Sequence, residues 1–302
     1  MLAPHVEQAN TPYRLRMKLP AFDYHTPTTV QEAVELLGQH GDAARPLAGG
    51  QSLMPMMAFR LATPAVIVDL NRISGLDGIV IDDSGVHLGA LVRWRDIEDS
   101  AALRKAHPLL CEAVSHIAHY QIRNRGTVGG SLANADPASE LCGVAVTCDA
   151  SIEVMGTGGR RTVGADDLLV GSMMTSLAAD DLITGIRFPA WPAARKWAFL
   201  EFSRHRGDFA LSGIALHYDP AADGTAKDVR IGVIGAHMRP IRLKAAECAL
   251  EGNAVNKDTI AAACAAARDA IEPAEDIHAS PAYRRALTAT LLERGLRRAA
   301  GI

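Results

Sequence analysis

Two glycine-rich segments, far apart in the chain, place the strongest constraint on how it can fold. Residues 47–53 read LAGGQSL, and residues 125–131 read RGTVGGS. Adjacent glycines let a backbone turn through positive φ and come close to a ligand, and successive N–H groups in such a turn form an anion-binding nest. Two nests with flanking hydroxyl residues predict one long ligand with two phosphates, held by two loops that meet in space.

Ordinary turns are the alternative, because Gly-Gly pairs often mark turns that bind nothing. Neither segment matches the G-x-G-x-x-G pattern that opens a helix, or the G-x-x-x-x-G-K-[ST] pattern. The sequence therefore predicts neither a Rossmann dinucleotide site nor a P-loop, and the glycines alone leave the ligand open.

Composition and spacing exclude several classes of function. The 302 residues are typical of two domains, and the formal net charge of −3 gives no basic face for nucleic acid. No apolar run reaches the length of a membrane span, and no histidine pair has a metal spacing such as H-E-x-x-H. The cysteines match neither C-x-x-C nor the plant-type iron–sulfur pattern, so we expect small buried thiols without disulfides. If the chain handles electrons, its own cofactor is organic and any iron–sulfur cluster belongs to another chain. The cysteines are Cys111, Cys142, Cys148, Cys248 and Cys264.

Periodicity and capping signals indicate an α+β fold. Residues 29–40 are predicted to form a helix, because Thr29 is a plausible N-cap, Glu32 completes a capping box and Gly41 follows the end. Short β segments are mixed with helices without a regular β-α-β rhythm. Further helices are expected at residues 95–100, 108–118, 260–271 and 281–300, and strands at residues 45–47, 66–70, 86–90, 145–154, 199–202, 214–218 and 229–236.

A set of ordered motifs carries a resemblance to a known family. The motifs are RPLAGGQSL at residues 45–53, IVDLN at 67–71, QIRNRGTVGGS at 121–131, ADPASEL at 135–141, FLEFSR at 199–204 and GDFA at 207–210. Together they closely resemble the FAD-binding medium subunit of the molybdenum hydroxylases, the family of carbon monoxide dehydrogenase and xanthine dehydrogenase. The resemblance covers nearly everything from Lys18 to the C-terminus.

The resemblance implies a domain organisation. We expect an FAD-binding domain of the vanillyl-alcohol-oxidase (PCMH) type, made of two α+β subdomains, over residues 17–192. A smaller α+β C-terminal domain of molybdenum-hydroxylase flavoproteins is expected over residues 193–302. Residues 1–16 are polar, contain proline and lack the apolar stretch of a signal peptide. We expect an N-terminal extension there, whose role the sequence leaves open.

The resemblance also implies a non-covalent FAD site. Hydroxyls of Ser52, Thr127 and Ser131 suit hydrogen bonds to phosphate oxygens, although relatives carry His or Thr at the position of Gln51. Asp136 is expected to reach the sugar–phosphate region, with a plain turn before Pro137 as the alternative. Phe209 is expected to pack on the flavin ring or gate it, with core packing as the alternative, so the residue on the ring stays open. The implied contacts are Arg45, Leu47, Ala48, Gly49, Gly50, Gln51, Ser52, Leu53, Gly126, Thr127, Gly129, Gly130, Ala133, Asp136 and Phe209.

The function implied by the resemblance is electron transfer within a heterotrimer. A large partner subunit would hold the molybdenum cofactor and oxidise the substrate, and a small partner subunit would carry two [2Fe–2S] clusters. FAD in this chain would collect their electrons and pass them to an external acceptor, a role that needs no catalytic acid, base or metal ligand here. The resemblance further implies a dimer of heterotrimers in the cytoplasm, and leaves open an association with the inner face of the membrane.

Two other functions stay open at this point. A self-sufficient flavin oxidase or reductase of the same fold superfamily would need a substrate pocket and its own acid or base. A non-catalytic scaffold would need no intact glycine segments. The substrate and the final electron acceptor are not given by this chain, so purines, N-heterocycles, aldehydes and carbon monoxide all remain candidates.

Overall fold

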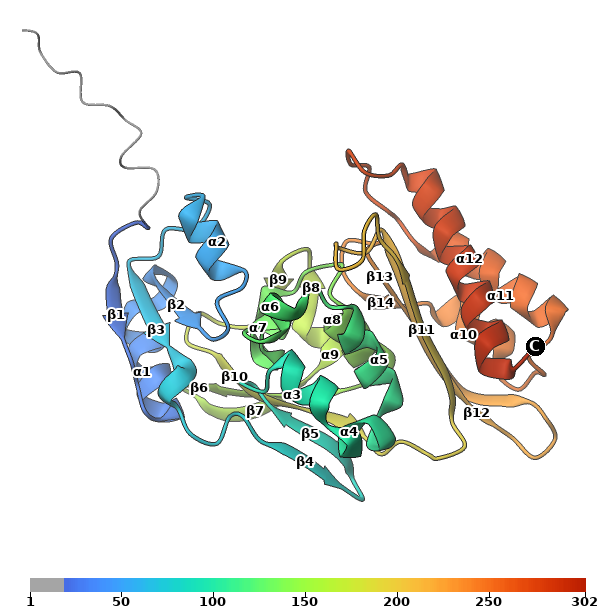
Figure 1. The fold of residues 1–302 in the computed structure, drawn as a ribbon, viewed down its shortest axis with the longest axis horizontal. Helices are drawn as coiled ribbons and strands as arrows, with labels where there is room; N and C mark the ends of the chain where they lie inside the picture. The colour runs from blue at the N-terminus through green and yellow to red at the C-terminus, as the bar shows by residue number, and fades with distance from the viewer. Residues whose placement is uncertain (1–18) are drawn as a thin grey trace, which may run out of the picture.

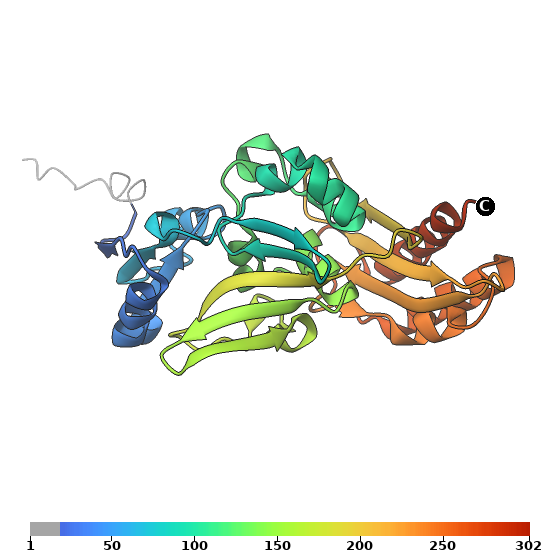
Figure 2. The same ribbon diagram turned by 90° about the horizontal axis from the view of Figure 1, so that it is seen from below.

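The computed structural model describes residues 19–302, and the expected extension at residues 1–16 lies outside this range. The described chain forms three main sheets with their helices, one after another along the long axis of the molecule, and one small two-stranded sheet (Figures 1 and 2). Each main sheet has its own cluster of buried hydrophobic side chains. This mixture of parallel and antiparallel sheets with helices confirms the expected α+β fold.

The first unit is a small parallel sheet in the order β1-β3-β2, covered by α1. Helix α1 begins where predicted, because the Thr29 hydroxyl accepts a hydrogen bond from the Glu32 amide and the Glu32 carboxylate accepts one from the Thr29 amide. Its buried face packs on the sheet. The elements are β1 (Asp23–His25), α1 (Val30–His40), β2 (Ala44–Leu47), α2 (Leu53–Ala58) and β3 (Val66–Asp69), with 3₁₀ turns at Gly41–Ala43 and Leu70–Arg72.

The second unit is an antiparallel sheet in the order β4-β5-β10-β6-β7. Its strands are β4 (Ile79–Asp82), β5 (Gly85–Gly89), β6 (Ser151–Gly156), β7 (Gly159–Gly164) and β10 (Leu182–Pro189), and β8 (Leu169–Gly171) pairs separately with β9 (Met174–Thr175). Its helices are α3 (Trp94–Asp99), α4 (Ala101–Ala106), α5 (Pro108–His116), α6 (Tyr120–Arg123), α7 (Val128–Asn134), α8 (Glu140–Thr147) and α9 (Ala165–Leu168).

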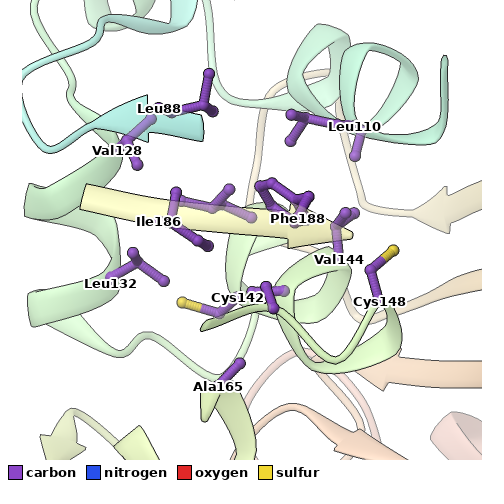
Figure 3. Close-up of a cluster of buried hydrophobic side chains, with 14 of the residues drawn as sticks. Leu88, Leu110, Val128, Leu132, Cys142, Val144, Cys148, Ala165, Ile186 and Phe188 are labelled. Carbon is purple, nitrogen blue, oxygen red and sulfur yellow. The ribbon is translucent and has the colours of Figure 1, made fainter. Parts of the chain in front are cut away.

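Helices α5, α7 and α8 bury their apolar side chains around strand β10 (Figure 3). Val128 and Leu132 of α7 gather there with Ile186 and Phe188 of the strand, and all four are almost fully buried. Burial of such side chains stabilises the fold by roughly 1.5–3 kcal/mol each. Helix α7, although short, is therefore held in place by the core of the second unit.

The third unit is an antiparallel sheet in the order β11-β12-β13-β14. Helices α11 and α12 lie on the outer side of this sheet, and α5 and α8 of the second unit lie against its other face (Figure 1). The elements are β11 (Lys196–Phe202), β12 (Ser212–Pro220), β13 (Ala226–Ile234), β14 (Ile241–Arg242), α10 (Lys244–Leu250), α11 (Lys257–Ala270) and α12 (Pro281–Ala300).

The contact between the second and third units is close and charged. A Cβ atom built on Gly232 of β13 would lie 2.0 Å from the Thr147 hydroxyl oxygen of α8, so the strand and the helix touch. The Asp149 carboxylate, just beyond α8, pairs with Arg230 and Arg242 of the third sheet at 3.0 and 2.8 Å. Helix α8 therefore packs in the core of the second unit and also against the third sheet.

One expected strand is right only in its second half. The strand predicted over residues 145–154 begins at Ser151 as β6, whereas α8 extends to Thr147. The Ser139 hydroxyl caps α8 by accepting a hydrogen bond from the Cys142 amide. Residues 141–147 are all buried, and a helix buried on all sides has no polar face to reveal its period in the sequence.

Candidate FAD site

The two glycine-rich segments lie against each other, as expected of loops that meet in space. A Cβ atom on Gly49 would lie 2.2 Å from the Arg125 carbonyl oxygen and 2.9 Å from the Gly126 Cα atom. The Asn71 side-chain amide, from the IVDLN motif, donates to the Ala48 carbonyl at 3.0 Å and to the Asp69 carboxylate at 2.6 Å. Three motifs that are separate in the sequence therefore lie in contact at one site in the structure.

The first segment forms an open turn between β2 and α2. Gly50 has a φ of 72°, in the left-handed region that favours glycine. The four successive amide N–H groups of residues 49–52 have no hydrogen-bond acceptor within the described part of the chain. Their carbonyls are used instead, since Gly49 accepts from the Gln51 side chain and Gly50 accepts from the Met54 amide. Unpaired neighbouring donors of this kind suit an anion.

The second segment is different, and the expectation of a second open turn is wrong. Helix α7 begins at Val128, with Thr127 as its N-cap, and Gly126, Gly129 and Gly130 all lie outside the left-handed region. The Gly129 amide donates to the Ala90 carbonyl at 2.8 Å, and the Gly130 amide donates to the Thr127 hydroxyl at 3.2 Å. Neither amide is left over for a phosphate.

Close packing explains the glycines of the second segment. A Cβ atom on Gly126 would lie 2.6 Å from the Trp94 ring nitrogen, and one on Gly129 would lie 2.6 Å from the Ala90 Cβ atom. A Cβ atom on Gly130 would lie 2.8 Å from the Thr127 hydroxyl oxygen. Glycine is needed at these positions because a side chain would collide with neighbouring residues. The backbone conformation does not require it, because none of the three has a positive φ.

Several expected contact residues have partners within the protein. The Arg45 guanidinium donates to the Asp42 and Ala44 carbonyls at 3.1 and 2.7 Å, so it lies along its own strand. The Ser131 hydroxyl bonds the Ser139 hydroxyl at 2.9 Å. The Ser52 hydroxyl makes no capping bond at the start of α2 and is exposed. Leu47 and Leu53 are half-buried at the two ends of the first segment, and Ala133 is exposed on α7.

Asp136 forms a turn before Pro137, which is the alternative to its expected contact with the cofactor. One carboxylate oxygen accepts a hydrogen bond from the Ala138 amide at 2.9 Å, as an Asx turn does. The other oxygen has no hydrogen-bond partner in residues 19–302. Burial raises the pKa of this carboxyl, an effect that the Ala138 amide partly offsets. The turn leaves one acceptor oxygen of Asp136 for a ligand.

Phe209 is not a core residue. Its side chain is 74% exposed, in the loop between β11 and β12, so the core-packing alternative is wrong. Gly207 sets the loop against the end of α5, because its φ is 88° and a Cβ atom there would lie 2.5 Å from the Ala118 carbonyl oxygen. An exposed aromatic ring on a glycine-bent loop is available to cover a flat ligand.

A pair of partly buried carboxyls, Glu140 and Glu201, lies near Asp136 and was not predicted from the sequence. Burial, together with the nearby charges of Glu201 and Asp136, raises the pKa of Glu140 to about 8. One Glu201 oxygen lies 3.5 Å from the His116 ring nitrogen, while the other is buried without a hydrogen-bond partner in the described part of the chain. No spacing rule marks these residues, since they come together only when α8 packs against the third sheet.

Comparison with known proteins extends these observations to the whole chain. Residues 20–191 match a family described as the FAD-binding domain in molybdopterin dehydrogenase, and residues 197–299 match the CO dehydrogenase flavoprotein C-terminal domain. The nicotine 6-hydroxylase medium subunit of Paenarthrobacter nicotinovorans is 41% identical, over 92% of this chain and 97% of that protein. The carbon monoxide dehydrogenase medium chain of Hydrogenophaga pseudoflava is 37% identical, over 92% and 96%.

Solved structures show the same similarity. Carbon monoxide dehydrogenase from Hydrogenophaga pseudoflava, in a form that lacks the Mo-pyranopterin moiety of the molybdenum cofactor, superposes with a TM-score of 0.92. That pair is 39% identical and covers 94% of this chain and 99% of the other. Quinoline 2-oxidoreductase from Pseudomonas putida 86 gives a TM-score of 0.89 at 34% identity, with the same coverage.

The chain therefore belongs to the family of FAD-binding medium subunits of molybdenum hydroxylases, as the motifs indicated. It is an oxidoreductase subunit with an FAD-binding domain. Of the helices in the described range, none is long and apolar enough to cross a membrane. Within residues 19–302, no group of three or more His, Cys, Asp or Glu residues could hold a metal ion.

Proposed function

We propose that this chain is the electron-transfer subunit of a heterotrimeric molybdenum hydroxylase. It takes electrons from [2Fe–2S] clusters of a small partner subunit and passes them to an external acceptor, while a large partner subunit holds the molybdenum cofactor. We further propose a dimer of heterotrimers, in the cytoplasm or at the inner face of the membrane. Family membership supports the proposed assembly. The open turn at residues 49–52 supports the proposal that this chain binds FAD.

The open turn fits the pyrophosphate of FAD. Four neighbouring N–H groups without protein acceptors would otherwise cost free energy when water is excluded, and a diphosphate supplies charged oxygens for them. Gly49, Gly50, Gln51 and Ser52 would hold this group, with the exposed Ser52 hydroxyl beside them. Thr127, Gly129 and Gly130 act differently, by forming the rigid wall of α7 against which the turn is placed.

The remaining contacts follow from where the other expected residues lie. The free oxygen of Asp136 would accept a hydrogen bond from a sugar hydroxyl, and Phe209 would shield the flavin ring from water. Bound FAD supplies the one- and two-electron chemistry, and the protein supplies binding, orientation and exclusion of water. We propose a boundary between the FAD domain (residues 17–192) and the C-terminal domain (residues 193–302) in the segment between β10 and β11.

The test is an absorbance spectrum of the protein purified from its native host, followed by acid release of cofactors and metal analysis. We expect a flavin spectrum, FAD in the supernatant, and iron and molybdenum with two additional chains. Flavin on a chain without partners, bleached directly by a substrate, would favour a self-sufficient oxidase instead. Absence of flavin from both the complex and the isolated chain would overturn the proposal.

A further inference from the structure

A buried arginine in the third unit connects two of the segments assigned above to the FAD site. Arg284 lies near the start of α12 and is only 6% exposed. One of its terminal nitrogens donates to the Leu211 and Gly235 carbonyl oxygens, each at 2.7 Å. The other donates to the Asp276 carboxylate at 2.7 Å. Burying a guanidinium is costly unless its donors are used. Both terminal nitrogens of Arg284 are bonded, whereas its Nε is buried without a hydrogen-bond partner among the described residues.

The first of these bonds fixes the loop that carries Phe209. Leu211 follows Phe209 by two residues, and its amide donates to the Phe202 carbonyl at 2.8 Å, which closes the loop between β11 and β12. The Arg284 guanidinium then holds the carbonyl of the same residue. Leu211 is therefore tied on both its donor and its acceptor side, while the Phe209 ring remains exposed.

The second bond fixes the turn that carries Asp136. The Gly235 amide donates to the Pro137 carbonyl at 2.9 Å, and the Gly235 carbonyl accepts from Arg284. Gly235 has a φ of 71°, and a Cβ atom there would lie 2.3 Å from the Ala210 carbonyl oxygen. Gly235 thus lies between the Asp136 turn and the Phe209 loop, and touches both.

We propose that Arg284 is a positioning residue of the flavin site. It fixes the distance between the Phe209 loop and the Asp136 turn, and it does so through backbone atoms without reaching the cofactor. The inference rests on the proposed function, since it takes Asp136 and Phe209 to be FAD contacts. The planar guanidinium suits this task because it holds several acceptors in fixed directions, which a lysine ammonium on a flexible stem does not.

The experiment compares Arg284→Lys with Arg285→Gln in the full-length chain. Arg285 is the adjacent residue of the same helix and, among the described residues, donates only to the Ile271 carbonyl, at 3.3 Å. Its replacement therefore serves as the matched control. Three properties are measured: the free energy of unfolding in urea, the Kd for FAD by fluorescence titration, and the visible circular dichroism of the bound flavin. The visible spectrum reports how the ring is held, which a change in overall stability does not alter.

We expect Arg284→Lys to raise the Kd for FAD about tenfold and to change the visible circular dichroism, while Arg285→Gln matches the wild type. The apoprotein of Arg284→Lys should also be cut faster by trypsin after Arg204 and Arg206, which lie in the Phe209 loop and are exposed. An Arg284→Lys protein with the wild-type Kd, spectrum and cleavage rate would overturn the inference. A wild-type chain that binds no FAD would instead overturn the proposed function.

If Arg284→Lys does not fold, Asp276→Asn tests the positioning role of Arg284 instead. This change keeps the arginine and removes one charged partner, whose side chain is 42% exposed, so the fold is preserved. A changed visible spectrum with an unchanged free energy of unfolding would support the positioning role. A spectrum identical to that of the wild type would overturn it.

Discussion

The two glycine-rich segments look alike in sequence but do different work in the structure. At residues 49–52 the backbone turns through positive φ at Gly50 and leaves neighbouring N–H groups without acceptors in residues 19–302. At residues 126–130 the glycine N–H groups are already bonded, and glycine is required because Gly126 lies directly on Trp94 and Gly129 directly on Ala90. A glycine pair can therefore make a binding surface or permit close packing, and the backbone φ and the hydrogen-bond partners of its amides distinguish the two cases.

The carboxyl groups beside the two segments differ in the same way. Near the first segment, burial would raise the pKa of Asp69, but hydrogen bonds from Tyr24 and Asn71 together with the charge of Arg125 outweigh it, and the pKa is lowered. Near the second segment, burial dominates and raises the pKa of Asp136 and Glu140. The first segment lies in polar, hydrogen-bonding surroundings, and the second borders a drier core.

The largest effect is expected where a side chain is forced into the second segment. Gly129→Val should lower the free energy of unfolding by about 3 kcal/mol or more, because its Cβ atom would lie 2.6 Å from that of Ala90 and 3.0 Å from its carbonyl oxygen. Urea unfolding of the apoprotein measures this. Gly158→Ala is the control, since nothing lies within 4 Å of a Cβ atom there. A fully stable Gly129→Val chain that had lost only FAD would break the comparison.

The first segment should lose binding rather than stability. Gly50→Ala should weaken FAD binding by on the order of a hundredfold, since the altered turn misplaces roughly two charge-assisted hydrogen bonds. The free energy of unfolding should fall by only about 1–2 kcal/mol, the cost of a left-handed conformation. Gly75→Ala has a similar positive φ with no neighbours, so it should match the stability loss and keep the wild-type Kd. Equal Kd values for both variants would show that the turn does not bind FAD.

The sequence predicted the fold and the meeting of the two segments, but not how the second one is built. The capping box at Thr29 and Glu32 is local, so its helix was found with correct bounds. The acceptors of the Val128 and Gly129 amides are the carbonyls of Val92 and Ala90. Those residues are remote in sequence, and no local pattern predicts that their carbonyls accept hydrogen bonds from the first amides of α7.

Long-range partners also explain the residues that were missed. Arg284 is one of several arginines in a helix with a charged face, and only its contacts with Leu211 and Gly235 distinguish it. Glu140 reads as an ordinary residue in the first turn of α8, where a negative charge is favourable. Its raised pKa comes from burial and from the nearby charges of Glu201 and Asp136. Phe209 was the reverse case, because an apolar residue predicts burial and the structure exposes it.

An intermediate effect is expected for Glu140, beside the second segment, whose pKa makes the stability of the chain depend on pH. The pKa of Glu140 is about 8 in the folded chain and has an ordinary value of 4.5 when exposed. Between these values the folded state holds a proton that the unfolded state releases, so stability falls as the pH rises through this range. Glu140→Gln should remove that dependence and stabilise the chain at pH 8 by on the order of 2 kcal/mol, with little change at pH 4. Tm measured across this pH range tests it, and Glu35→Gln on the exposed face of α1 should leave the profile unchanged. A decline in Tm that persists in Glu140→Gln would contradict the assignment.

The smallest effect separates capping from ligand binding at the second segment. Thr127→Ala removes the acceptor of the Gly130 amide and should lower the free energy of unfolding by about 1 kcal/mol, as loss of an N-cap does. Thr127→Ser keeps the hydroxyl and should restore it. Because α7 stays packed through Val128 and Leu132, the Kd for FAD should change less than threefold in either variant, a difference of about 0.6 kcal/mol. A large loss of FAD affinity in Thr127→Ala, at unchanged stability, would mean that this hydroxyl bonds the cofactor when it is present, and that the second segment binds FAD directly as well as supporting the first.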